Sequence, residues 1–193
     1  TPATQTPPLD LRLSHINCGS ASLIDRQQRT RQLTLVCGGP DYPQRFREKW
    51  MVRVADELKE AQRIKVYEKF FREFGTDGQL VVLEALSNFV SRRKTDALLL
   101  EALQSKKGAV VGTAANIAVS IRPEGIEEHL IETYRRVYAQ REFEAVQSIF
   151  DALGRLGSVA AKGVLDRHTD ANHPGVKQAA LNAIKVIEAA EER

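Results

Sequence analysis

Five side chains with oxygen or nitrogen donors lie within eight residues near the carboxyl end of the sequence. They are Asp166, His168, Asp170, Asn172 and His173. Carboxylate, amide and imidazole groups of this kind can bind divalent metal ions. Turns between helices are also rich in Asp and Asn, because these residues cap helices and accept turn geometry. We therefore interpret the segment as a turn, and we predict neither a metal site nor a cofactor.

The sequence also lacks the usual patterns of an enzyme active site. No serine stands in a Gly-x-Ser-x-Gly elbow, and the Gly-Gly-Pro that follows Cys37 lacks the Gly-Lys-Ser/Thr ending of a phosphate loop. The four histidines are spread over different segments and pair with no obvious nucleophile. We therefore predict that the protein is not an enzyme.

Basic residues recur at three points where turns are expected. Arg92, Arg93 and Lys94 occupy the first, Arg122 the second and Arg155 the third. If these turns belong to stacked units, they lie along one edge at the spacing of neighbouring helices, about 10 Å. We predict that this basic ridge binds a partner. The alternative is a set of solvated charges with no partner.

Cys18 and Cys37 are the two cysteines of the chain. Both lie in a stretch that is expected to form paired strands, so we predict a disulfide between them. In the chain-entropy model such a bond stabilises a small element by about 3 kcal/mol. It favours a periplasmic or secreted location. The alternative is two buried thiols in a cytoplasmic protein.

The composition is that of a packed protein of modest charge. The chain has 193 residues, of which 42% are hydrophobic, and 28 basic against 25 acidic residues give a net charge of +3. That charge makes nucleic acid an unlikely partner on electrostatic grounds. No apolar run reaches the roughly 20 residues that span a bilayer. We expect residues 1–9, which are rich in Pro and Thr, to form a disordered tether.

The hydrophobic pattern changes between the two ends of the chain. Partial alternation predicts strands at 10–17 and 31–37, with room for a third short strand between them. We group residues 10–40 as a small β element. From position 44 apolar residues recur every three or four positions, which predicts a helical hairpin over 41–75.

The remaining sequence consists of segments that can be aligned with one another. Offsets of 32 and 35 residues bring Leu98, Leu130 and Leu165 into register. The same alignment, with a further offset of 31, brings together Val82, Ala114, Ile149 and Ala180. A period of this length with two apolar helices per unit is typical of a helical solenoid. We predict units at about 76–108, 109–141, 142–172 and 173–193, the last with one helix.

The segment VQSIFDALGRLGSVAAKGVLDRHTDANHPGVKQAALNAI resembles HEAT repeats of the bacterial type. The features are small and apolar residues on the first helix, a Leu-Gly turn, a second helix with Leu, and Pro at the start of the next unit. The likeness extends over about 79–188, although Ile121, Arg122 and Pro123 replace the Leu-Gly turn in the second unit. It implies a mainly α fold, a short right-handed α-α superhelix, used for protein binding. It transfers no catalytic residue.

Together these features favour a non-enzymatic interaction or scaffolding module, part of a bacterial envelope assembly, that binds a protein partner. The alternative is a nucleic-acid-binding HEAT-like protein or a base-processing enzyme that uses the basic ridge. Steep loss of binding with rising salt would distinguish that alternative. HEAT resemblance also permits an assembly factor or lyase for a chromophore protein, which no residue here favours.

Overall fold

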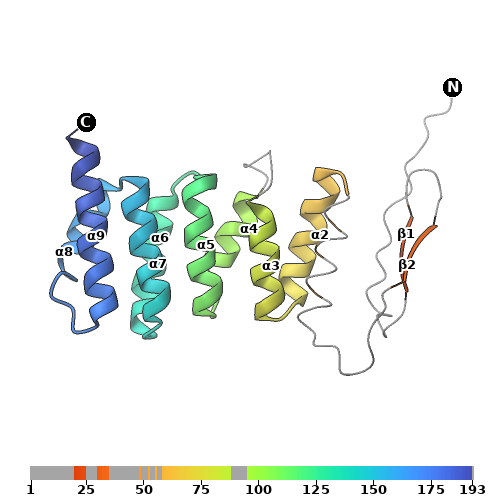
Figure 1. Ribbon diagram of the computed structural model, residues 1–193, viewed down its shortest axis with the longest axis horizontal. Coiled ribbons are helices and arrows are strands. Elements are labelled where there is room, and N and C mark those ends of the chain that lie inside the picture. Colours follow the sequence, from red (N-terminus) through yellow and green to blue (C-terminus); the bar gives the residue numbers. More distant parts are fainter. Residues whose placement is uncertain are drawn as a thin grey trace. The chain divides into compact units, whose positions relative to one another are not determined.

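The computed structural model describes residues 20–24, 30–34, 48, 52, 55, 58–87 and 95–192 (Figure 1). The chain divides into two compact units, Thr1–Arg47 and Glu48–Arg193. Three residues of the basic ridge, Arg92, Arg93 and Lys94, lie outside the described residues. So do Cys18 and Cys37, and the disulfide between them stays a prediction.

In the first unit the described residues, 20–24 and 30–34, form two antiparallel strands. Strand β1 (Ser20–Ile24) pairs with β2 (Thr30–Thr34), and Ser20 lies opposite Thr34 while Ile24 lies opposite Thr30. The second strand overlaps the one predicted at 31–37, and β1 falls in the interval where a third strand had room. The strand predicted at 10–17 lies outside the described residues.

The second unit is helical throughout its described part. Residues 48, 52 and 55 are helical, and Val52 and Ala55 are buried. A carboxylate oxygen of Glu48 accepts a hydrogen bond of 3.2 Å from the N–H of Gly75, at the start of α3. The helices are α2 (Glu60–Glu73), α3 (Thr76–Leu86), α4 (Asp96–Leu103), α5 (Gly108–Ile121), α6 (Ile126–Ala139), α7 (Phe143–Leu156), α8 (Lys162–Asp166), which follows the 3-10 turn η3 (Val159–Ala161), and α9 (Pro174–Glu191).

These helices form two rows. In the odd row α3 packs on α5, α5 on α7 and α7 on α9. The even row consists of α2, α4, α6 and α8, and its helices contact one another much less (Figure 1). The two rows meet through the pairs α2 with α3, α4 with α5, α6 with α7, and α8 with α9.

This pairing differs by one helix from the units that the sequence alignment outlined. Helices α3 and α4 fall within 76–108, and α7 and α8 fall within 142–172. Helices α5 and α6 correspond to 109–141, although α5 begins one residue earlier, at Gly108. Packing instead joins α4 to α5 and α6 to α7, and it gives α9 a partner in α8. A period defines the length of a unit and leaves its starting point open. The fourth segment is therefore half of a packed pair.

The aligned positions carry the core. Val82, Ala114, Ile149 and Ala180 have 0% of their surface exposed, and each lies on a helix of the odd row. Leu98, Leu130 and Leu165 are at most 1% exposed and lie on α4, α6 and α8. The apolar period therefore marks the faces along which the two rows meet.

Small residues let the helices of the odd row approach closely. A Cβ added at Gly154 of α7 would lie 2.8 Å from Cα of Ala183 in α9. At Gly112 of α5, the added Cβ would lie 3.0 Å from Oγ of Ser148 in α7. Both distances leave little or no room for a side chain. At Gly154 the obstacle is the backbone of α9, and at Gly112 it is the side chain of Ser148.

Candidate functional site

The basic ridge is described at two of its five residues. Arg122 and Arg155 are exposed at the carboxyl ends of α5 and α7, which are neighbours in the odd row. Arg122 ends α5 in a left-handed conformation with φ of 52°, and its Nε donates a hydrogen bond of 3.4 Å to the carbonyl of Val119. A cation at a helix carboxyl end is stabilised by the helix dipole by about 0.3–1 kcal/mol. Both arginines therefore have a local structural role.

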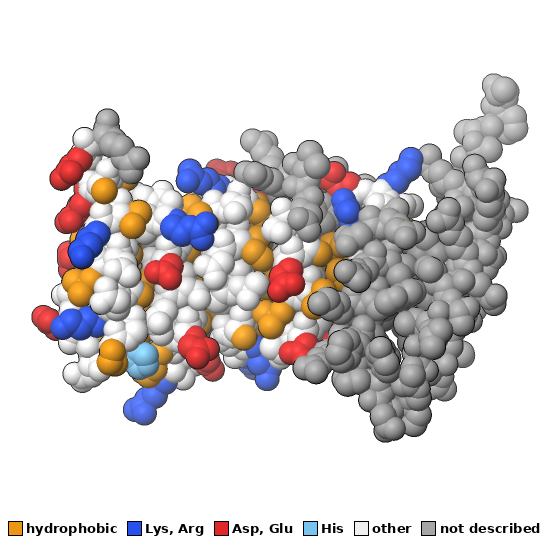
Figure 2. Space-filling view, viewed as in Figure 1, with side chains coloured by type: hydrophobic (Ala, Val, Ile, Leu, Met, Phe, Trp, Pro, Cys, Tyr) orange, Lys and Arg blue, Asp and Glu red, His pale blue; other side chains and the backbone are white. Residues whose placement is uncertain are grey.

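The face of the odd row that points away from the even row carries little charge at its centre. Helix α5 has no charged residue, and its exposed positions include Ala109, Asn116 and Ser120. Its neighbours present exposed carboxylates, which are Asp77 and Glu84 on α3 and Glu144 and Asp151 on α7. Figure 2 shows this face, with acidic side chains on either side of a weakly charged strip over α5. We call the exposed residues of α3, α5 and α7 the odd-row face.

Desolvation alters one of these carboxyl groups. Burial raises the pKa of Asp151 above its usual range, and the positive charge of Arg155, one turn along α7, opposes this effect. The odd-row face therefore shields Asp151 from water even though its side chain reaches the surface. A partner that supplies a positive group or a hydrogen-bond donor there would favour the ionised form.

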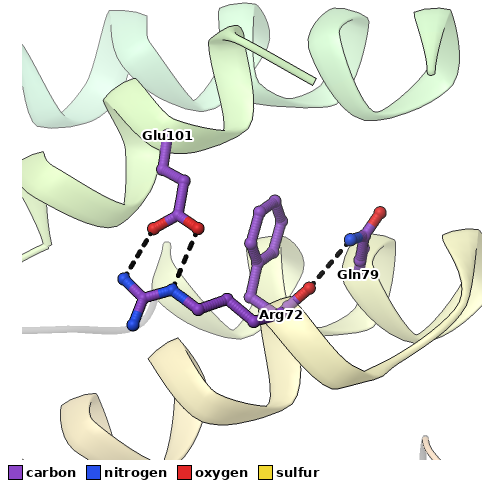
Figure 3. Close-up of polar contacts among 4 residues, drawn as sticks. Arg72, Gln79 and Glu101 are labelled. Atoms are coloured by element: carbon purple, nitrogen blue, oxygen red, sulfur yellow. Dashed lines mark hydrogen bonds and ion pairs between the residues drawn. The ribbon is translucent and has the colours of Figure 1, made fainter. Parts of the chain in front are cut away.

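The even row contrasts with this face, because its exposed side chains form polar links between helices. Arg72 of α2 donates two hydrogen bonds to the carboxylate of Glu101 on α4, at 3.0 and 2.8 Å (Figure 3). Nearby, Nε2 of Gln79 donates to the carbonyl of Phe71 at 2.8 Å and joins α3 to α2 (Figure 3). The Arg72–Glu101 contact uses two side chains of the even row within the protein itself, and the Gln79–Phe71 contact links the two rows.

Arg136 on α6 provides a second link along the even row. Its two terminal nitrogens donate hydrogen bonds of 2.9 Å to the carbonyl of Ser105 and 2.6 Å to that of Leu103. Leu103 is the last residue of α4, whose final carbonyls have no partner within the helix. Arg136 therefore caps α4 from the neighbouring helix.

The segment first considered for metal binding lies in an aromatic cluster. His168 is 8% exposed, and its ring centroid lies 5.3 Å from that of Tyr134, 4.8 Å from Tyr138 and 5.5 Å from Phe150. The Tyr134 hydroxyl and Nε2 of His168 share a hydrogen bond. Phe143 extends the cluster toward the surface, where Tyr138 is 38% exposed.

Two other donors of that segment, His173 and Asp170, have partners of their own. Nδ1 of His173 accepts a hydrogen bond of 3.3 Å from the N–H of Val176 and so caps α9. The carboxylate of Asp170 lies 3.6 Å from Nζ of Lys177. Within the described ranges, no three His, Cys, Asp or Glu residues are grouped so that they could hold a metal ion. His168, His173 and Asp170 therefore take part in packing, a helix cap and an ion pair, respectively.

Burial controls the protonation of the Tyr134–His168 pair. Desolvation lowers the pKa of His168, and the nearby positive charge of Arg167 lowers it further. Burial also raises the pKa of Tyr134. Desolvation and the charge of Arg167 therefore both favour the neutral imidazole, and desolvation favours the neutral phenol.

Sequence reasoning missed this pair, although the alignment contained a signal for it. The offset of 35 residues that matches Leu130 with Leu165 also matches Thr133 with His168. The same offset matches Tyr134 with Thr169, so His168 lies next to the residue that corresponds to Tyr134 in the following unit. Tyr134 and Tyr138 stand one turn apart on α6, which places two aromatic rings on one side of that helix.

Comparison with protein-family models, with curated proteins and with solved structures finds no match to this chain. None of the helices in the described part of the chain has the length and apolar character needed to cross a membrane.

Proposed function

We propose that this protein is a non-enzymatic interaction module, a short HEAT-like right-handed α-solenoid that binds a protein partner on its odd-row face. The observation that carries this proposal is the regular stacking of helix pairs into two rows. Each pair contacts its neighbours, as expected for repeats that bury their apolar faces against one another. An array of this kind offers a long surface for a partner.

The unequal packing of the two rows favours the odd row as the inner surface. Small residues bring α5, α7 and α9 close together, whereas neighbours in the even row touch far less. A stack that is tighter on one side curves toward that side. The odd-row face then becomes the concave surface, which is the usual binding surface of a solenoid.

The side chains of the odd-row face support the same conclusion. Charged residues are depleted at the centre of protein interfaces, and α5 has none. The even row, in contrast, uses Arg72, Glu101 and Arg136 for internal contacts. Glu84 and Asp151 flank α5 and would repel a phosphate backbone laid across it. The odd-row face therefore suits a protein more than a nucleic acid.

The location forms part of the proposal and rests on the predicted disulfide. A disulfide between Cys18 and Cys37 would require an oxidising compartment, so we propose a periplasmic or secreted protein that acts in an envelope assembly. The basic ridge, with Arg122 and Arg155 at the edge of the odd row, would lie beside the bound partner.

Site-specific photo-crosslinking tests the binding face. A benzophenone amino acid replaces Asn116, exposed on α5, or Ala97, exposed on α4 and used as the control from the even row. In native extract we expect one discrete adduct from position 116 and none from position 97. Excess wild-type protein should suppress the adduct at position 116. Asn116→Arg should weaken binding of the captured protein without loss of helicity. Equal adducts from both positions, or an adduct from position 97 alone, would overturn the proposal.

A further inference from the structure

We propose that the Tyr134–His168 pair is an acid-sensitive contact, and that protonation of His168 releases α8 and the residues that lead to α9 from α6 while α9 stays packed on α7. The inference concerns the conformation of the even row. It does not depend on the proposed function.

The segment between α7 and α9 is short and is attached to α6 at its two ends. At the first end Oγ of Ser158 donates a hydrogen bond to the Glu127 carboxylate on α6, just before η3. At the second end His168 bonds to Tyr134, also on α6. Between these points α8 packs on α9, and Nζ of Lys162 lies 2.6 Å from the Glu191 carboxylate. Loss of the Tyr134–His168 contact therefore frees one attachment to α6 and leaves those to α9.

A proton on His168 conflicts with its surroundings. The neutral ring can accept a hydrogen bond from the Tyr134 hydroxyl at Nε2. An imidazolium can only donate at Nε2, so the Tyr134 oxygen would have to become the acceptor and its hydroxyl hydrogen would lose its present partner. The new charge would be enclosed by the rings of Tyr134, Tyr138 and Phe150, which offer little compensation for lost hydration.

The charged groups nearby add to this penalty. From α6 the titratable groups that face His168 are Tyr134 and Tyr138, and α7 contributes the uncharged Phe150. On its own segment the positive charge of Arg167 opposes protonation, and the carboxylates of Asp166 and Asp170 are exposed to water. No carboxylate is among the described groups that enclose the ring.

The direction of the pH response follows from the lowered pKa of His168. In the released segment the pKa of this group returns toward the ordinary value of about 6.5. The released form therefore binds the proton more tightly than the closed form. Above about pH 6.5 His168 is neutral in both forms, and the Tyr134–His168 contact keeps its full stability. Below that pH, the equilibrium constant for release rises by up to about tenfold for each pH unit. The rise ends at the pKa of His168 in the closed form.

Hydrogen exchange of the full chain, read by mass spectrometry at pH 7.5 and pH 5.5, tests this response. After correction for intrinsic exchange, we expect protection of residues 162–172 to fall by up to about tenfold at the lower pH, while α7 and α9 stay protected. His168→Phe keeps an aromatic ring and cannot titrate, so its protection should not change with pH. His173→Asn retains an N-cap acceptor and should preserve the wild-type response.

A second measurement keeps the test independent of any folding defect in the variants. An NMR titration of the wild-type protein should show the His168 ring titrating below the ordinary histidine value of about 6.5, with the amides of α8 shifting at the same midpoint. The proposal fails if protection of 162–172 is unchanged by pH, if His168→Phe shows the wild-type response, or if the amides of α8 shift at another midpoint.

Discussion

Individual small residues control the distance between helices in the odd row. Gly154 is buried on α7, and the place its Cβ would occupy lies 2.8 Å from the backbone of Ala183. Backbone atoms cannot rotate away as a flexible side chain can. The contact between α7 and α9 therefore has little capacity to absorb added volume.

Replacing Gly154 tests this close contact. We expect Gly154→Ala to lower the free energy of unfolding by about 1–3 kcal/mol, because the added methyl group forces α7 away from α9. Gly163→Ala is the matched control. No atom lies within 4 Å of its added Cβ, and alanine favours a helix over glycine by about 1 kcal/mol. Urea denaturation of both variants measures the difference, and equal stability would show that α7 and α9 can separate without cost.

At the scale of elements, the sequence alignment predicted most of the helical organisation and few of its polar contacts. Apolar side chains repeat because each unit buries the same face, so Leu98, Leu130 and Leu165 could be aligned without a structure. The pairing of α4 with α5 could not be read from the period, which has no defined starting point.

The polar links and the candidate site were harder to predict for a different reason. Arg136 and His168 contact residues about one unit away through a single side chain, and single polar residues produce no periodic signal. Arg122 and Arg155 could be located at the turns of neighbouring helices because those turns follow the apolar period. At these positions an arginine can stabilise the backbone carbonyls at a helix end or bind a partner. A sequence pattern does not distinguish these two roles.

The link between α4 and α6 leads to a prediction at this scale. Arg136→Met retains the apolar stem and removes two hydrogen bonds to the end of α4, so we expect a loss of about 1–3 kcal/mol in the free energy of unfolding. Arg135→Met removes the same charge from an exposed position of α6 and should change stability by less than about 0.5 kcal/mol. Thermal and urea unfolding of the pair measure the link. Equal losses would assign the effect to net charge.

At the scale of the helical unit, stability is expected to be local. Helix α9 packs on α7 and α8, and α5 and α7 separate it from α3 within the odd row. In an array of this kind each pair is stabilised mainly by its neighbours, and opening can begin at an end. The pH response proposed for His168 belongs to the same end, where the short helix α8 is the least extensive element of the even row.

A core substitution in α9 distinguishes local from global stability. Ile187 is 0% exposed, and Ile187→Ala should cost about 2–5 kcal/mol through the cavity that it leaves. Hydrogen exchange should then accelerate in α8 and α9, less in α7, and remain unchanged in α3. Val186→Ala, at a position 47% exposed on the same helix, is the control and should alter exchange little. If Ile187→Ala accelerated exchange equally from α3 to α9, the helices would unfold as one cooperative body. Acid release of α8 alone would then be incompatible with that cooperativity, because no segment could open by itself.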